Sequence, residues 1–253
     1  MKALITGASS GIGRDFARQL SRRGFDLILA ARRVPRMEEL ARELPTHVRV
    51  VGVDLSCKDQ CFELYREVCG DRIDVMINCA GFGLFGPFDE TDLDRELELI
   101  DVNIRAVHIL TKLFYRDFKK RGSGYLLNVA SSAAFQPGPL LSSYYASKAY
   151  VLRLTQALAE ELRRDGSGVY IGALCPGPVR TEFDAVANVR FSLKGLSSEF
   201  VARYALDKMF AHKTVIVPGM QMKAALFGER FLPQSAIVRL AYYMQKRKKG
   251  PKP

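Results

Sequence analysis

The sequence lacks any apolar run that approaches the roughly 18 residues of a membrane-spanning helix. Cysteines are few: there are five, an odd number at irregular spacings, which argues against a disulfide framework and favours a reducing compartment. The first strand-like run begins at Lys2, so we expect no signal peptide and a cytoplasmic protein. Linkers, repeats and low-complexity stretches are also lacking, which predicts a single domain over residues 1–253.

Positive charge is in excess, with a formal net charge of +11. Most of it is spread along the chain, but one dense cluster stands at the end: Lys246, Arg247, Lys248, Lys249 and Lys252. No recognisable nucleic-acid-binding module surrounds this cluster, so we expect no nucleic-acid partner. A solvated tail and a contact with an anionic partner are both compatible with it.

Short β-branched or apolar runs alternate with segments of helical periodicity. The expected strands are Lys2–Thr6, Phe25–Ala31, His47–Val53, Ile73–Asn78, Tyr125–Ser131, Val169–Cys175 and Thr214–Pro218. The expected helices are Ile12–Arg23, Pro35–Leu44, Asp59–Cys69, Thr91–Lys120 and Ser142–Asp165. Strands such as LILA and YIGALC are apolar without alternation, which is typical of burial on both faces. The pattern predicts an α/β fold: a doubly wound parallel sheet with helices on both faces.

The first expected strand ends in a glycine-rich turn that opens directly into a helix. The turn reads Thr6-Gly7-Ala8-Ser9-Ser10-Gly11-Ile12-Gly13. Glycines allow the backbone to approach a pyrophosphate, and the helix N-terminus supplies free N–H groups. Placement between strand and helix favours a dinucleotide site over an ordinary turn. The spacing, TGxxxGxG, differs from GxGxxG and resembles that of the short-chain dehydrogenase/reductase family, which implies a Rossmann-like domain.

The second expected strand ends at Arg32 and Arg33, without an acid at the position where NAD-binding sites of this kind place one. A carboxylate there would repel a 2′-phosphate, whereas an arginine can bind it bidentately. Both arginines could also be ordinary surface charges. Their position favours NADP(H) over NAD(H).

Tyr144 and Lys148 stand four residues apart in YYASK, so on a helix they share one face. An ammonium group near a tyrosine favours the phenolate and lowers the phenol pKa from about 10. Ser131 lies thirteen positions before Tyr144, and Asn103 lies in DVNIRA. Their positions resemble those of the family's catalytic serine and asparagine. Four motifs in this order favour a catalytic site over a chance pair on a helix surface.

The resemblance implies hydride transfer between the nicotinamide and a carbonyl carbon, without a metal. Tyr144 would exchange the proton with the substrate oxygen, and Ser131 would hold that oxygen. Lys148 would hold the nicotinamide ribose and lower the pKa of Tyr144, and Asn103 would position a water. Further cofactor contacts are implied for Asp54, Leu55, Asn78, Ala80, Gly81, Pro176, Gly177, Val179 and Thr181. The chain has Cys79 where the family has a second asparagine.

Some neighbouring residues are set apart from the site. Tyr145 lies three residues from Lys148 and does not fit YxxxK, and Ser132 would face away from Ser131 if the strand continued. We expect both to be packing or surface residues. Cys57 and Cys61 are better interpreted as helix residues than as half of a zinc site.

An apolar substrate is favoured by two segments. A substrate lid is expected at about 182–200, where Phe183, Val186, Val189, Phe191 and Leu193 lie. The loop Gly81–Phe88 adds Phe82, Leu84, Phe85 and Phe88. Such residues suit an apolar or bulky carbonyl better than a sugar, but a lid or subunit interface packed on itself would look the same.

The C-terminal extension at about 220–253 has apolar residues that lead into the basic cluster, and it resembles that of reductases of the 3-oxoacyl and steroid types. It could attach weakly to anionic lipid, cap the core or join a dimer. The family resemblance suggests a homo-oligomer. For function, we expect an NADP(H)-dependent reductase of an apolar ketone or 3-oxoacyl compound. The alternatives are an NAD(P)-dependent dehydrogenase working in the oxidising direction and a non-catalytic NADP-sensing regulator.

Overall fold

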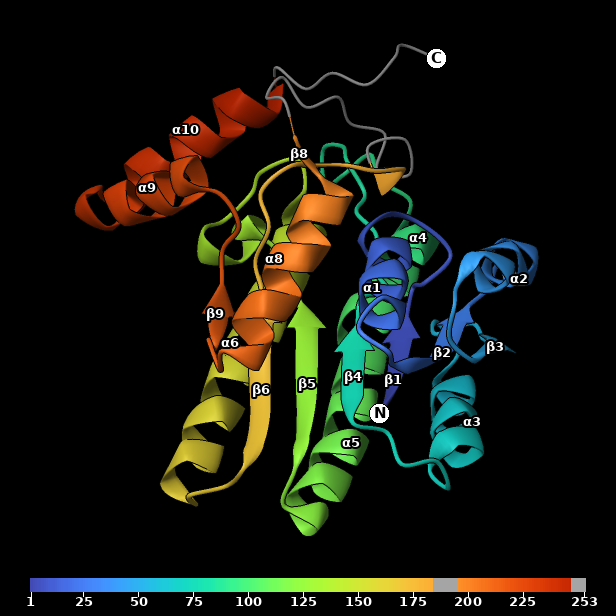
Figure 1. Ribbon diagram of the computed structural model, residues 1–253. Helices are drawn as coiled ribbons and strands as arrows, with labels where there is room; N and C mark the ends of the chain where they lie inside the picture. Colours follow the sequence, from blue (N-terminus) through green and yellow to red (C-terminus); the bar gives the residue numbers. More distant parts are fainter. Residues whose placement is uncertain (184–194, 247–253) are drawn as a thin grey trace.

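The computed structural model describes residues 1–183 and 195–246. Parallel strands form one sheet in the order β3-β2-β1-β4-β5-β6-β9 (Figure 1). These strands are β1 (Lys2–Thr6), β2 (Asp26–Ala31), β3 (Val48–Gly52), β4 (Val75–Asn78), β5 (Gly124–Val129), β6 (Val169–Leu174) and β9 (Val215–Ile216). Two short strands, β7 (Val179–Arg180) and β8 (Leu196–Ser197), pair with each other. The predicted doubly wound, Rossmann-like α/β fold is confirmed.

Helices connect the strands and cover both faces of the sheet. They are α1 (Gly11–Ser21), α2 (Val34–Glu43), α3 (Lys58–Val68), α4 (Leu93–Ile100), α5 (Val107–Arg121), α6 (Ser142–Arg164), α8 (Ser198–Phe210), α9 (Met220–Gly228) and α10 (Gln234–Lys246). Three short helical segments are the π-helix η1 (Asp101–Ala106) and the 3-10 turns η2 (Ser132–Phe135) and η3 (Glu229–Phe231). In the described ranges no helix is both long and apolar enough to cross a bilayer.

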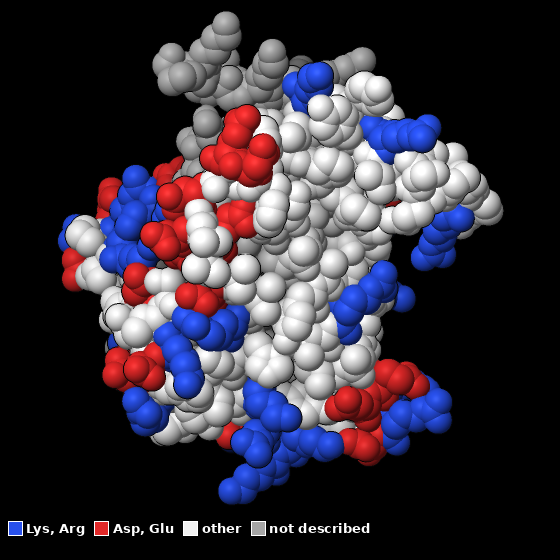
Figure 2. Space-filling view, turned by 180° about the vertical axis from the view of Figure 1, so that it is seen from behind, with Lys and Arg blue, Asp and Glu red and all other residues white. Residues whose placement is uncertain are grey.

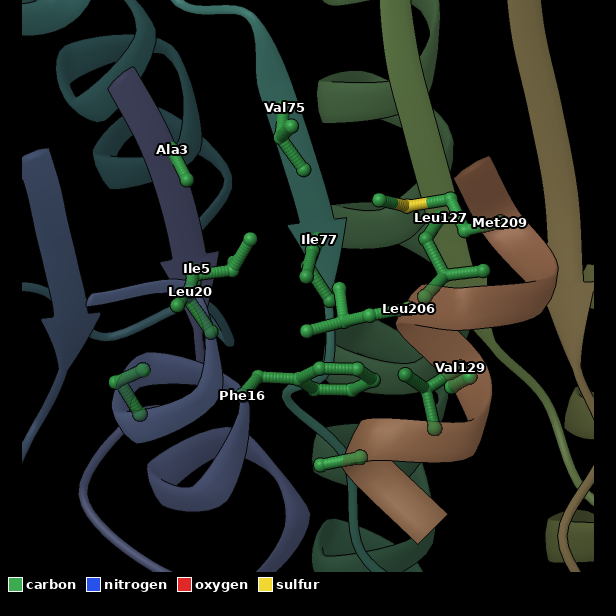
Figure 3. Packing of buried hydrophobic residues seen from close by; sticks show 14 of the residues in the cluster. Ala3, Ile5, Phe16, Leu20, Val75, Ile77, Leu127, Val129, Leu206 and Met209 are labelled. Atoms are coloured by element: carbon green, nitrogen blue, oxygen red, sulfur yellow. The ribbon is translucent and has the colours of Figure 1, made fainter. Parts of the chain in front are cut away.

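The core consists of one hydrophobic layer on each side of the sheet. Successive strand residues point to opposite faces, so Ile5 packs against α1, α2 and α8 while its neighbour Leu4 packs against α3, α5 and α6. Figure 3 shows the first layer, where Phe16 of α1 extends toward α8 and lies beside Leu206. Both layers are fully buried at their centres, which holds the strand ends at fixed positions.

Three local expectations differ from the structure. The expected helix Thr91–Lys120 is α4, η1 and α5, because the backbone widens into a π-helix over Asp101–Ala106. The strand expected to reach Ser131 ends at Val129, where the chain turns toward η2. Helix α8, which begins where we expected the end of a lid, was not predicted.

The order in which strands are added to the sheet reverses at β1: β2 and β3 lie on one side of it, and β4 and the later strands lie on the other. In doubly wound sheets this switch point opens a crevice at the carboxyl ends of the strands. Hydrogen bonds fix its walls: Thr6 Oγ1 accepts from the backbone N–H groups of Cys79 (3.0 Å) and Ala80 (3.2 Å). The Gly7 N–H donates to the Ala30 carbonyl at 2.8 Å. The glycine turn is therefore tied to both neighbouring strands.

Candidate active site

The glycine turn has the shape and the donors to receive a pyrophosphate. Gly7 has a φ of +68°, and a Cβ atom there would lie 2.8 Å from the Ala80 backbone. A Cβ at Gly13 would collide with the Gly7 carbonyl oxygen. Helix α1 has no capping side chain and no acid in its first turn, so its first N–H groups stay free for an anion. The turn fits the dinucleotide that the sequence predicts.

Arginines surround the end of the crevice where a 2′-phosphate would lie. Arg33 donates to the hydroxyl oxygens of Ser9 (3.2 Å) and Ser10 (2.6 Å). The Glu182 carboxylate bridges Arg33 and Arg36, at 2.7 and 2.6 Å. This pair of guanidinium groups therefore already binds one carboxylate. Arg36 was not among the residues predicted from the sequence.

Arg32, predicted beside Arg33, forms an ion pair with Glu98 of α4 at 2.9 Å. It stays exposed at the edge of the cavity. Asp54, at the end of the neighbouring strand, accepts from the N–H (3.0 Å) and hydroxyl (2.8 Å) of Ser56. Burial raises the pKa of Asp54, but the Ser56 hydrogen bonds and the charge of Arg32 outweigh it, so the pKa is lowered and the carboxylate is ionised.

Lys148 places an ammonium group in the interior. Its Nζ donates to the Val129 carbonyl at 2.9 Å. The thiols of Cys79 and Cys175 are its electrostatic neighbours, and burial raises the pKa of both to about 12, so neither provides a counter-ion. With both thiols neutral, burial lowers the pKa of Lys148 to about 8.

Tyr144 faces Ser131 in the same cavity. Burial raises the pKa of Tyr144 to about 12, and the nearby Ser131 hydroxyl only partly opposes this. The Lys148 Nζ lies 5.8 Å from the centre of the Tyr144 ring. The expected lowering of the Tyr144 pKa by Lys148 is therefore not found, because desolvation of the phenol dominates. At neutral pH Tyr144 carries its proton.

Asn103 is placed by the π-helix, a local form often found at functional sites. Its Nδ2 donates to the Phe82 carbonyl (2.9 Å) and to Ser147 Oγ (3.1 Å). Its Oδ1 accepts from the Phe82 N–H at 3.1 Å. A Cβ at Gly81 would lie 2.8 Å from Asn103 Oδ1 and 3.2 Å from the Lys148 Nζ. Asn103 thus fixes the loop beside Lys148 rather than facing the open cavity.

One cavity of about 1040 Å³ brings the predicted site residues together. Of those residues, Asn78 and Asn103 are not in its lining. The Asn78 amide is turned into the sheet, where its Nδ2 donates to Thr111 Oγ1 (3.2 Å) and Asn128 Oδ1 (2.8 Å). The lining includes the predicted Gly7, Ser9, Ser10, Gly11, Ile12, Gly13, Arg32, Arg33, Asp54, Leu55, Ala80, Gly81, Ser131, Tyr144, Lys148, Pro176, Gly177, Val179 and Thr181.

The lining also contains residues that we expected elsewhere. Ser132 faces the cavity because strand alternation ends at Val129. Tyr145 faces it too, and its hydroxyl accepts from Gln245 Nε2 of α10. Burial raises the pKa of Tyr145 to about 12.

Apolar side chains close the other end of the cavity. Phe82 lines it as expected, whereas Phe88 points to solvent. The Phe183 ring lies 5.3 Å from that of Tyr144. The remaining expected lid residues, Val186, Val189, Phe191 and Leu193, lie outside the described residues. The segment from α9 through α10 supplies most of the rest: Met222, Ala225, Leu226, Leu232, Ile237, Leu240, Ala241 and Met244.

Comparison with known proteins agrees with this geometry. The family model described as short chain dehydrogenase matches residues 1–190. The chain belongs to the short-chain dehydrogenase family. An uncharacterized oxidoreductase of Staphylococcus epidermidis is 33% identical over 181 residues, which are 71% of this chain and 78% of that protein. The very-long-chain 3-oxoacyl-CoA reductase of Bos taurus is 30% identical over 71% of this chain and 60% of its own length.

Two solved structures of the family resemble the whole chain. A short-chain dehydrogenase from Sphingobium yanoikuyae in complex with NADPH superposes with a TM-score of 0.82 at 31% identity, covering 93% of this chain and 94% of that one. The bulky-bulky ketone specific alcohol dehydrogenase of Comamonas testosteroni has a TM-score of 0.76 at 29% identity, covering 92% and 98%. The protein is therefore an oxidoreductase of the short-chain dehydrogenase family.

The buried ammonium of Lys148 predicts a pH-dependent stability. The native lysine loses its proton near pH 8, whereas the unfolded lysine keeps it to about pH 10.4. The unfolded state binds more protons between these two pH values, so the free energy of unfolding should rise with pH. The expected rise from pH 7.5 to 9.5 is about 2 kcal/mol. Urea denaturation of wild type and Lys148→Met at pH 7.5 to 9.5 checks this. We expect Lys148→Met to lose the rise and the exposed-lysine control Lys112→Met to keep it; parallel curves for wild type and Lys148→Met would contradict the assignment.

Proposed function

We propose that the protein is an NADP(H)-dependent oxidoreductase that reduces an apolar ketone or a 3-oxoacyl compound. The observation that supports this most is the continuity of one cavity. It has guanidinium groups at one end, Ser131, Tyr144 and Lys148 in the middle, and a chamber of apolar side chains at the other. A cofactor with a charged 2′-phosphate and an apolar substrate would meet at the tyrosine.

The protonation states support the reducing direction of this chemistry. NADPH, when bound, supplies the hydride. Tyr144, whose pKa is about 12, can donate a proton to the substrate oxygen as negative charge develops there. The Ser131 hydroxyl stabilises that charge by a hydrogen bond. Lys148 gives the site a positive charge close to Tyr144, which stabilises the phenolate that remains once the proton has been transferred.

Support for NADP(H) comes from the charges at the adenine end. The Arg33 and Arg36 guanidinium groups already hold the Glu182 carboxylate, an oxyanion of smaller charge than a phosphate. Exchange of that carboxylate for a 2′-phosphate would preserve both contacts. The Sphingobium yanoikuyae relative in complex with NADPH is consistent with this choice.

Support for an apolar substrate comes from the chamber and from the relatives. Polar side chains in it are few, chiefly Tyr145 and Glu229. The neighbour from Comamonas testosteroni is specific for bulky-bulky ketones, and the Bos taurus relative reduces very-long-chain 3-oxoacyl-CoA. Both substrate types are carbonyls next to a large apolar group.

Exposed apolar residues on α4 support the proposed homo-oligomer. Leu93 (68% exposed), Leu97 (48%) and Ile100 (40%) follow one another at helical spacing and form a stripe along α4. Burial of this stripe against a second copy would remove apolar surface from water.

The cofactor preference is tested by replacing the arginines singly. Arg32→Ala and Arg33→Ala should weaken NADPH binding by about tenfold or more while changing NADH binding less, because only NADPH carries the 2′-phosphate. Fluorescence titration of both cofactors measures the difference. Arg42→Ala, an exposed arginine of α2, serves as the matched control and should change neither. Wild-type NADH binding as tight as NADPH binding would overturn the preference.

The catalytic role is tested by NADPH consumption with a bulky ketone. Tyr144→Phe should lower kcat by at least about 100-fold with NADPH binding retained, because the variant has no proton to donate. Tyr145→Phe changes the neighbouring ring in the same way and should keep kcat within about fivefold. A regulator without catalysis would instead bind NADPH and show no turnover even as wild type. A faster reaction with NADP⁺ and a secondary alcohol at neutral pH would favour the oxidising direction.

A further inference from the structure

The last two helices carry an unusual share of exposed apolar surface. Eight of the fourteen large apolar side chains that are exposed in the described residues belong to residues 220–246. They include Phe227 (60% exposed), Phe231 (73%) and Tyr243 (63%). We refer to Met220, Phe227, Phe231, Leu232, Leu240 and Tyr243 together as the C-terminal apolar surface.

This surface lies at one corner of the molecule. Figure 1 shows α9 and α10 at that corner, beyond β9. Helix α9 has no fully buried residue. The rings of Phe227 and Phe231 pack edge to face with centres 5.3 Å apart, so these aromatics contact each other while remaining open to solvent. Exposure of this much apolar area in water marks a contact surface.

The charges around the C-terminal apolar surface are almost all positive. Residues 220–246 contain four cationic side chains and one carboxylate. The cations are Lys223, Arg230, Arg239 and Lys246, and the carboxylate, Glu229, lines the cavity. Figure 2 shows this corner at the upper right, a mainly white surface with separate blue side chains. Beyond Lys246 the sequence adds four more cations and no acidic side chain.

The cavity of the active site opens at this surface. Leu232 (48% exposed) and Leu240 (54%) belong to the C-terminal apolar surface and also line the cavity. Gln245, which is 2% exposed, fixes α10 above the cavity through its hydrogen bond to Tyr145. One side of the helix pair therefore lines the cavity while the other side faces solvent.

We propose that the C-terminal apolar surface docks on an anionic lipid bilayer. Aromatic and aliphatic side chains flanked by lysine and arginine are the composition that binds the interface of such a bilayer. A second copy of the chain would bring like charges together, because an isologous contact pairs this cationic surface with itself. The next step rests on the proposed function: the position of Leu232 and Leu240 gives apolar substrates a route from the bilayer into the cavity.

Sedimentation of the full chain with vesicles tests the docking without substrate or turnover. The vesicles are phosphatidylcholine alone and phosphatidylcholine with phosphatidylglycerol. Wild type should bind the anionic vesicles at least about tenfold more tightly than the neutral ones, and high salt should weaken the binding. The double variant Phe227→Ser/Phe231→Ser should lose at least about tenfold in binding to the anionic vesicles.

The matched control is Phe88→Ser, because Phe88 is 70% exposed but lies outside this surface. It should bind like wild type, and circular dichroism should be the same for all three proteins. Equal binding by the double variant and wild type would overturn the proposal, as would no wild-type binding to anionic vesicles. Concentration-dependent self-association that the double variant loses, without vesicle binding, would assign the surface to a second copy instead. Failure of the carbonyl reductase assay would leave these results unchanged.

Discussion

Lys148 carries its ammonium group into the interior at the carboxyl ends of β4 and β5, and the surrounding site is arranged around that charge. Its Nζ donates to the Val129 carbonyl, and the nearby thiols stay neutral. Burial of such a charged group costs free energy of folding. Buried groups with a shifted pKa are typical of functional sites. Tyr144 stands one helical turn earlier, so the same helix that buries the cation presents the phenol beside it. The π-helix holds Asn103 against the loop at Gly81, which lets that loop pass close to the ammonium group.

The two ends of the cavity differ in charge and polarity. At the glycine turn, free helix N–H groups and arginines favour anions, and Glu182 already occupies the guanidinium pair. At the other end, α9 and α10 add apolar side chains that are sequence-distant from the catalytic residues. The charged part and the apolar part of the cavity thus come from separate elements, with Tyr144 between them.

Much of the fold could be predicted from the sequence because burial on both faces leaves apolar strands without alternation, and the helices between them are amphipathic. The glycine turn and YxxxK are local spacings, so they located Gly7, Tyr144 and Lys148 without any tertiary information. Side-chain direction was harder to predict. The Asn78 amide turns into the sheet because it donates to Thr111 and Asn128, which are distant in sequence and come next to it only in the folded protein. Tyr145 was placed outside the site, since its partner Gln245 lies 100 residues away. Capping of the core was one of three possibilities for the C-terminal extension, but the sequence did not indicate that α10 lines the cavity.

Transfer of deuterium from NADPH that carries deuterium at both C4 positions to a bulky ketone tests the central claim, direct hydride transfer in this cavity, most directly. The account predicts one deuterium on the carbinol carbon of the alcohol product, detected by mass spectrometry and NMR. Consumption of NADPH with an unlabelled alcohol, or with no alcohol formed, would contradict it.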